Sequence, residues 1–202
     1  MDRFTPPKAA PPPREAEAPF GDPDVSLMLR FQKGDTAAFD ELVVRHQKAV
    51  LNIAWRYCGD RAVAEDLAQE IFVKVWRAKG SYQPSARFST WLYRIAVNRC
   101  LNEIRSRPKK SPLPVEETLE EPAGARPDDD LDRAEVRHAV RRAVDDLPAN
   151  QRMAVILSRF HELPYEEIAE AMSVSLEAVK SLLFRARENL KIALERLVRR
   201  EP

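Results

Sequence analysis

The chain has 202 residues, of which 44% are hydrophobic, and its formal net charge is +1. This length allows one or two small domains with a packed core, and near neutrality means that any nucleic-acid or membrane partner must be sought in the distribution of charge. No apolar run is long enough to span a bilayer, and the amino terminus has no apolar secretory core, which indicates a cytoplasmic protein without membrane insertion.

Prolines divide the chain into segments. Residues 1–23 hold seven of the 16 prolines, which predicts a disordered, extended tail. Residues 108–130 hold five more, together with a run of acidic side chains, and we expect a flexible linker with no core of its own. The remaining residues, 24–107 and 131–200, show helical periodicity and no useful alternating β pattern. The predicted fold class is therefore all-α, with two small helical domains joined by an acidic, proline-rich linker.

In the first segment, Asp35 or Thr36 can cap a helix that continues to residue 58, and Asp60 can cap a second helix over 61–78. In that second helix, apolar residues recur every four positions and predict one buried stripe. This stripe in the helix over 61–78 consists of Val63, Leu67, Ile71 and Val75. Residues 79–89 are expected to form a loop, which leads into a further helix within 87–110.

The helix within 87–110 has an unusual polar stripe. Arg94, Asn98, Asn102 and Arg105 lie at spacings of four, four and three, so they share one face. Residues 84–110 carry seven cations and one acid. Aromatic residues in and beside the preceding loop favour single-stranded nucleic acid, because an unstacked base needs a new stacking partner. The alternative is a core helix with aromatic packing and a solvated face.

The helix over 61–78 has a different outward surface. Its polar side comprises Glu65, Asp66, Gln69 and Glu70. Acidic residues near the start of a helix stabilise its dipole, which is one explanation. The same acidic and amide side chains could instead dock a basic partner helix.

In the second segment, the pattern predicts helices over 130–147, 149–163 and 165–172, then a break at 173–175 and a long helix from Leu176. A short helix, a tight break and a longer helix form a helix-turn-helix outline. Ser173 stands where a glycine is usual, and the last helix carries an excess of cations. Its polar face offers the groups that read duplex DNA, although a solvated basic face of a helical bundle is the alternative.

Other chemistries find no support. Two cysteines are too few for a disulfide framework, and both lie in apolar helical patterns. The three histidines are far apart in sequence, so no metal site or cofactor is expected. The sequence has no phosphate-binding loop and no nucleophile–base pair, so we expect a protein that is not an enzyme.

Three stretches carry a family resemblance: "AEDLAQEIFVKVWRA", "FSTWLYRIAVNRCLNEIR" and "LPYEEIAEAMSVSLEAVKSLLFRARENL". Their order and spacing closely resemble the extracytoplasmic-function (ECF) group of bacterial sigma-70-type sigma factors, over about residues 24–107 and 131–198. The resemblance implies a transcription initiation factor that directs core RNA polymerase to promoters. It also implies an anti-sigma factor as a partner. A stand-alone helix-turn-helix regulator and a sigma-like decoy for an inhibitor are the alternatives.

The resemblance also implies residue roles. It implies a core-polymerase surface on the helix over 61–78, a site for the melted −10 element on the loop over 82–87 and the helix after it, and a reader of the −35 duplex on the last helix. Leu182 stands where relatives often have a basic residue, so no DNA role is assigned to it. The implied residues are Asp66, Gln69 and Glu70 for core polymerase, Tyr82, Arg87, Arg94, Asn98 and Arg99 for −10 DNA, and Lys180, Ser181, Phe184 and Arg185 for −35 DNA.

The linker length fits such a role. Residues 108–130 number 23, and an extended chain of that length reaches about 75–80 Å. Two promoter elements two helical turns apart lie about 70 Å from each other. The linker is therefore long enough for one domain to sit at each element.

Overall fold

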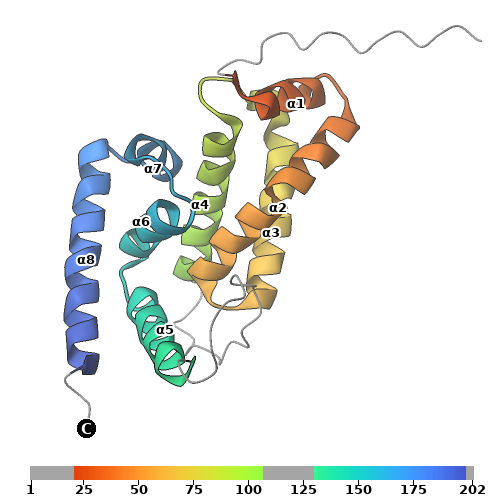
Figure 1. Cartoon of the computed structure of the whole chain (residues 1–202). Coiled ribbons are helices and arrows are strands. Elements are labelled where there is room, and N and C mark those ends of the chain that lie inside the picture. The colour runs from red at the N-terminus through yellow and green to blue at the C-terminus, as the bar shows by residue number, and fades with distance from the viewer. Residues whose placement is uncertain (1–20, 107–129, 199–202) are drawn as a thin grey trace, which may run out of the picture.

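The structure is a computed structural model that describes residues 21–106 and 130–198. Within these residues it contains eight α-helices and no strand, which confirms the all-α fold class (Figure 1). The predicted tail and linker lie almost wholly outside the described residues. The elements are α1 (Pro23–Gln32), α2 (Thr36–Cys58), α3 (Arg61–Ala78), the 3-10 turn η2 (Lys79–Ser81), α4 (Phe88–Ser106), α5 (Asp130–Asp145), α6 (Ala149–Phe160), α7 (Tyr165–Met172) and α8 (Leu176–Val198).

Helices α2 and α3 begin where the sequence predicts. The Asp35 carboxylate accepts a hydrogen bond from the Ala38 amide at 3.3 Å, and that of Asp60 accepts one from the Val63 amide at 3.1 Å. Each carboxylate satisfies an amide that has no partner within its own helix. Helix α2 ends at Gly59, whose φ of 72° is the left-handed conformation that glycine adopts at least cost.

The core of the first half follows the predicted stripe. Leu67, Ile71 and Val75 are at most 1% exposed, whereas Val63 at the start of α3 is only partly buried. Helix α1, which the sequence analysis did not describe, adds Met28 and Phe31 to the same core. The four helices α1–α4 therefore form one packed unit.

The second half contains the predicted helix-turn-helix. Helix α7 ends at Ser173, whose φ of 55° and ψ of 46° place it in the left-handed region, and α8 begins three residues later. The expected extent of the preceding helix, 149–163, is wrong. Helix α6 ends at Phe160 because Glu162 adopts a φ of 50°, and the Leu163 amide turns back to the Leu157 carbonyl.

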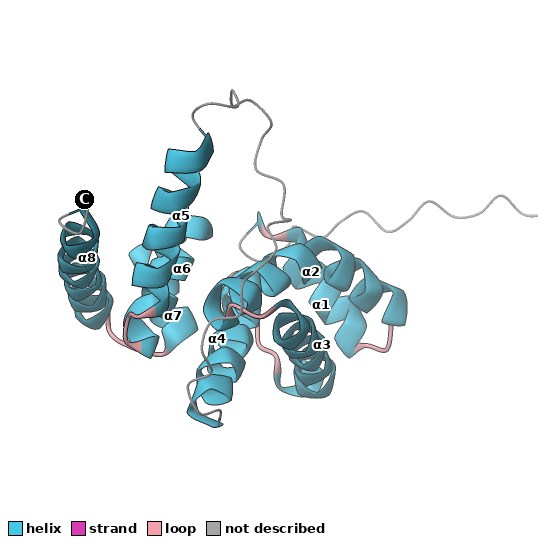
Figure 2. Ribbon diagram, turned by 90° about the horizontal axis from the view of Figure 1, so that it is seen from below, coloured by secondary structure: helices cyan, strands magenta, loops and turns pink. Residues whose placement is uncertain are grey.

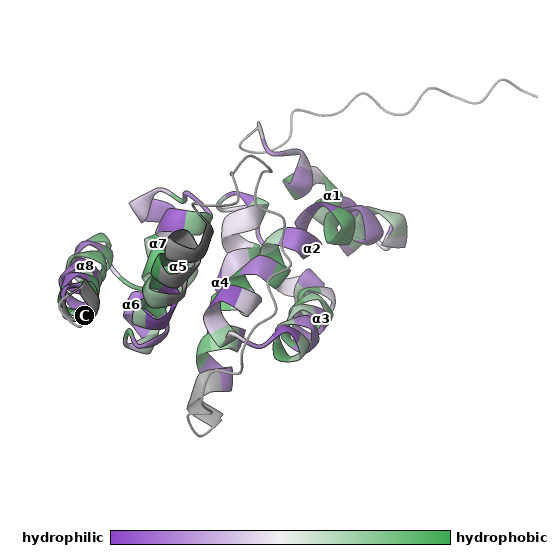
Figure 3. Ribbon diagram, turned by 60° about the horizontal axis from the view of Figure 1, so that its bottom comes forward, coloured by the Kyte–Doolittle hydropathy of each residue, from purple (hydrophilic) through white to green (hydrophobic). Residues whose placement is uncertain are grey.

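The helices are amphipathic, and Figure 3 shows hydrophilic and hydrophobic residues on each of them. Their apolar faces turn inward, with Ile156, Leu157 and Val179 fully buried in the second half. Among residues 21–106 and 130–198, no helix has the length and apolar character that crossing a membrane requires.

The two halves pack against each other. Helix α4 contacts α6 and α7, and α2 contacts α6. Figures 1 and 2 show α4 between the α1–α3 group and the helices of the second half. Buried apolar side chains form one continuous cluster from Val25 in α1 to Leu183 in α8. The flexible linker predicted two separate domains. The structure shows that they also form an interface, here called the seam, between α2 and α4 on one side and α6 and α7 on the other.

Candidate nucleic-acid interface

Helix α4 presents the predicted polar stripe to solvent. Arg94, Asn98 and Asn102 are all exposed, and the side chain of Arg105 lies outside the described residues. The opposite side of the helix is apolar, with Ala96 and Val97 fully buried. Burial of that face fixes the rotation of the helix, so the guanidinium and amide groups are held outward, where they can contact phosphates and base edges.

The loop before α4 encloses an aromatic cluster. The ring of Tyr82 lies 5.0 Å from that of Trp91 and 6.2 Å from that of Phe88, and Phe88 is fully buried. Tyr82 is 4% exposed, and burial raises its pKa to about 12. The ring of Tyr82 is thus a support beneath the loop and does not lie open for a base to stack on. Trp91 packs in this aromatic cluster, as the alternative of a core helix with aromatic packing predicted.

Arg99 occupies a different setting from Arg94. Its guanidinium pairs with the Glu70 carboxylate of α3 and, at 2.8 Å, with Glu103 of its own helix. The hydrogen bond to Glu70 is the main cause that raises the pKa of Arg99, and the same bond lowers the pKa of Glu70. The Arg99 side chain is only 17% exposed. It joins α3 to α4, so an expected polymerase residue and an expected −10 residue are in direct contact.

The outward face of α3 is more apolar than the sequence analysis recognised. Asp66, Gln69 and Glu70 are exposed as predicted. Val73 and Trp76 continue the same face and are 48% and 41% exposed. The available signal was the spacing, because Val73 lies four residues after Gln69 and Trp76 seven residues after it, and such positions share one face of a helix. Exposed apolar side chains beside acidic ones are typical of a protein-binding surface.

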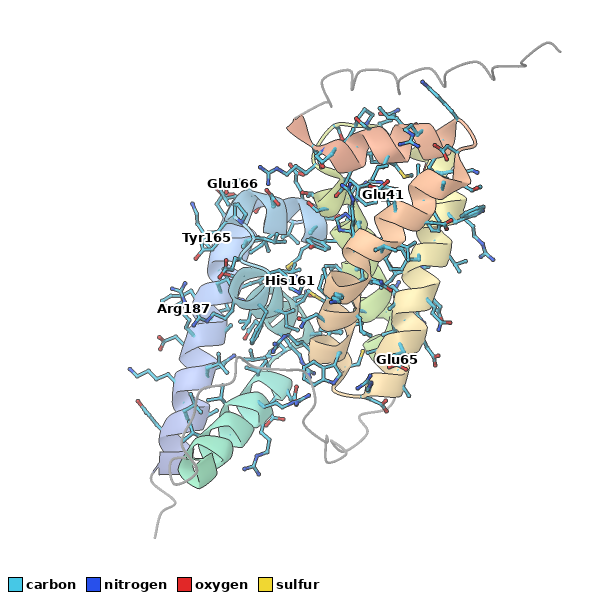
Figure 4. The ribbon with its side chains drawn as sticks, turned by 45° about the vertical axis from the view of Figure 1, so that its right-hand side comes forward. Glu41, Glu65, His161, Tyr165, Glu166 and Arg187 are labelled. Atoms are coloured by element: carbon cyan, nitrogen blue, oxygen red, sulfur yellow. The ribbon has the colours of Figure 1, made fainter. Side chains whose placement is uncertain are left out.

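The last helix presents the expected reading face. Lys180 and Arg185 are exposed, Phe184 is 63% exposed, and Ser181 is partly buried. Helix α8 is seated on α7, where an Arg187 guanidinium nitrogen donates to the Tyr165 hydroxyl at 3.3 Å (Figure 4). The exposed residues therefore project from a helix whose orientation is fixed by the helices beneath it.

Two polar helical faces on one all-α chain, the second within a helix-turn-helix, define a helical transcription factor. Residues 42–109 match the family model for sigma-70 region 2, and residues 137–190 match that for sigma-70 region 4. This chain therefore belongs to the sigma-70 family of RNA polymerase sigma factors, and its 38% identity to an ECF sigma-E factor places it in the ECF group. The matches fall in the predicted order, so neither the stand-alone regulator nor the decoy is favoured.

Relatives support the same assignment along nearly the whole chain. The chain is 38% identical over 186 residues to the ECF RNA polymerase sigma-E factor of Escherichia coli K12, covering 88% of this chain and 97% of the relative. It is 36% identical over 190 residues to the RNA polymerase sigma-H factor of Pseudomonas aeruginosa, covering 87% of this chain and 96% of the relative.

Two solved structures share the fold. CnrH, solved in complex with the cytosolic domain of CnrY, is 25% identical with a TM-score of 0.66, covering 86% of this chain and 98% of CnrH. The sigma factor RpoE of Bartonella quintana, solved with the anti-sigma factor NepR, is 25% identical with a TM-score of 0.58, covering 78% of this chain and 96% of RpoE.

Proposed function

We propose that this sigma factor binds core RNA polymerase, directs it to promoters through two DNA contacts, and stabilises the melted −10 strand. The polymerase performs the chemistry, so the proposal gives this chain no catalytic residue, metal or cofactor. It acts in the cytoplasm, where polymerase and chromosome meet. Residues 24–107 form the domain for polymerase and the −10 element, and residues 131–200 form the domain for the −35 element. The matches to region 2 and region 4, in that order, support this division.

One observation carries the proposal: a single chain exposes two polar helical faces, each backed by a buried apolar stripe. On α4 the face is made by Arg94 and Asn98, and on α8 by Lys180 and Arg185. The α8 face suits the major groove, because a guanidinium can bridge the acceptors of guanine and an apolar ring can contact a thymine methyl group. Exposed Phe184 supplies that ring.

The α4 face and its loop suit an unpaired strand. In this proposal, Arg94 contacts phosphates, and Asn98 contacts the hydrogen-bonding edge of a flipped base. Arg87, whose side chain is 67% exposed, lies at the junction of the loop and the helix. Base extrusion costs a few kcal/mol, and a pocket that offers amide hydrogen bonds offsets that cost. Melting is thus driven by binding energy and needs no hydrolysis by this chain.

Core polymerase docks on the outward face of α3. Asp66, Gln69 and Glu70 give this face its polar contacts, and Val73 and Trp76 give it an apolar part. The solved relative RpoE was captured with an anti-sigma factor, and we propose that an anti-sigma factor also regulates this chain.

Promoter binding requires the two halves to separate. In the structure α4 and α7 are in contact. Promoter elements two helical turns apart are about 70 Å from each other. The 23 residues of 108–130 can span that distance when extended, so an open arrangement is within reach of the chain.

Transcription with purified core polymerase on a set of promoters tests the proposal. Arg185→Ala should weaken closed-complex binding by about tenfold, because a bidentate base contact is worth roughly 1–3 kcal/mol. Arg187→Ala is the matched control, since that guanidinium is bonded to Tyr165 within the protein. Asn98→Ala should impair melting while −35 binding stays near that of the parent. If the chain fails to associate with core polymerase, or the complex initiates at no promoter, the proposal is wrong.

A further inference from the structure

Helix α1 contacts the first residues of the loop formed by residues 79–87, here called the −10 loop. The side-chain amide of Gln32, the last residue of α1, donates from Nε2 to the Lys79 carbonyl at 2.6 Å and to the Tyr82 carbonyl at 2.9 Å. One amide group thus joins the two ends of the η2 turn. It supplies partners to carbonyls at a point where α3 has ended and intrahelical partners are missing.

The other end of α1 contacts the other end of the loop. One carboxylate oxygen of Asp22 accepts from the Asp24 amide at 2.9 Å and caps α1. The second oxygen accepts at 2.9 Å from the amide of Phe88, the first residue of α4. A carboxylate at this position satisfies an unpaired amide and interacts favourably with the helix dipole. Asp22 therefore fixes the residue at which the −10 loop becomes α4.

Helix α1 is itself anchored independently of the loop. Val25, Met28 and Phe31 are fully buried in the core. The Asp24 carboxylate pairs with Arg45 and with His46 of α2, each at 2.7 Å. Phe31 also stacks on Phe39 of α2, with 4.7 Å between the ring centroids. Because this stacking and the Asp24 contacts do not involve residues 79–87, α2 holds α1 in place, and both ends of the loop are held from α1.

We propose that Asp22 and Gln32 are positioning residues for the −10 loop, which they hold in the shape that receives the melted strand. The inference rests on the proposed function of that loop. A loop ordered before binding loses less conformational entropy when the strand arrives, so the strand binds more tightly. Both residues precede residue 42, where the match to region 2 begins, and that match assigns them no role.

The test uses the full chain assembled with core polymerase. The probe is single-stranded DNA of the non-template −10 segment from the promoter that gives most transcript in the assay above. Gln32→Met keeps the side-chain length but removes both donors, and Asp22→Ala removes both acceptors. Asp22→Asn keeps one acceptor oxygen and replaces the other by a donor, so it is the partial variant. Asp24→Asn is the matched control, because Asp24 lies on the same helix and contacts α2 in place of the loop.

We expect Gln32→Met and Asp22→Ala to weaken single-strand binding by about tenfold, the effect of losing one or two hydrogen bonds that order the site. Replacing the captured base by an abasic site should cost these variants less than it costs the parent. Asp24→Asn should stay within about twofold of the parent, and Asp22→Asn should fall between Asp22→Ala and the parent, because it satisfies one of the two amides. Affinity for core polymerase and for −35 duplex should be unchanged in all four.

Two results would overturn the inference. One is single-strand binding by Gln32→Met and Asp22→Ala equal to that of the parent. The other is an equal loss of polymerase affinity, which would mean that α1 supports the whole domain. If the parent itself binds neither DNA probe, the proposed function fails, and that outcome is distinct from both.

Discussion

Glu167 of α7 forms an ion pair with Arg87, the last residue of the −10 loop, across the seam between the two halves, with 3.9 Å between Oε1 and Nη1. The other carboxylate oxygen of Glu167 accepts from the hydroxyl of Thr90 at 3.4 Å. Beside this contact, the ring of Tyr93 in α4 meets the ring of His161 at 5.7 Å. The first helix of the helix-turn-helix thus covers one flank of the helix proposed to bind −10 DNA.

Reversing one charge should open this seam. Glu167→Lys places a cation opposite Arg87 and removes the acceptor of Thr90. Because Arg87 is well exposed, the effect should be modest, about 1 kcal/mol, or a shift of about fivefold toward the open state. Distances measured by fluorescence energy transfer between labels on α2 and α8 should lengthen. Glu166→Lys, an exposed neighbour on the same helix (Figure 4), is the control and should leave the distances unchanged. Equal distances in both variants would contradict the prediction.

Acid should weaken the fold through His161, which Figure 4 shows on the side of the second half that faces α2. Burial lowers its pKa to about 4, and Arg56 acts in the same direction. In the unfolded state the pKa of His161 is near 6.5, so the unfolded state binds more protons than the folded state between pH 6.5 and 4. The stabilising contribution is therefore complete above pH 6.5 and is lost as the pH falls toward 4.

Replacing His161 by phenylalanine isolates this effect. We expect the parent to lose about 2 kcal/mol of unfolding free energy between pH 7 and pH 5 relative to His161→Phe, as measured by urea unfolding. Burial raises the pKa of Asp145, which acts in the opposite sense, but Asp145 is common to both proteins. Parallel pH profiles for the two proteins would show that His161 titrates normally.

Substitutions of the two serines Ser173 and Ser175 in one turn should change the free energy of unfolding in opposite directions. Ser173 has a φ of 55°, where a side chain costs roughly 1–2 kcal/mol, so Ser173→Gly should raise the free energy of unfolding by up to about 1 kcal/mol. Ser175 caps α8, because its hydroxyl accepts from the Ala178 amide at 3.2 Å. Ser175→Ala should therefore lower the free energy of unfolding by about 1 kcal/mol. Changes of the same sign in thermal melts would refute this account of the turn.

The contact between Glu70 and Arg99 should appear as an energetic coupling. In a double-mutant cycle, Glu70→Ala and Arg99→Ala should be non-additive in unfolding free energy by about 1 kcal/mol, because half of the Glu70 side chain remains in solvent. Asp66→Ala with Arg99→Ala is the matched cycle. Asp66 is exposed on the same helix, and this second cycle should be additive within experimental error. Equal coupling in both cycles would indicate a long-range effect in place of the ion pair.

Local features of the chain were predictable from the sequence. The caps at Asp35 and Asp60 and the break at Ser173 depend on residues within a few positions, and the structure confirms them. The exposed stripes on α4 and α8 follow from helical periodicity alone. The helix ends that depend on tertiary contacts were less accurate, as the end of α6 at Phe160 shows.

Relationships between distant residues were not predictable. Gln32 and Tyr82 are 50 positions apart, and Asp22 and Phe88 are 66 positions apart, so no local sequence pattern predicts the hydrogen bonds between them. Helical periodicity predicts only the face of α4 on which Arg99 lies. Its pairing with Glu70 depends on how α3 crosses α4. The seam depends likewise on which surfaces meet when two amphipathic units pack.

The seam also sets a threshold for gene selection under the proposed function. Thr90, 3% exposed, faces Glu167 of α7, and Tyr93, 8% exposed, packs on His161 between α6 and α7, so DNA reaches this flank of α4 only when the second half leaves it. The apparent affinity for any promoter is then its intrinsic affinity scaled by the fraction of open molecules. Strong promoters tolerate a tight seam and weak ones do not. Substitutions that tighten the seam would therefore lower occupancy first at the weakest promoters, while the order of promoter affinities and the DNA-reading side chains stay the same.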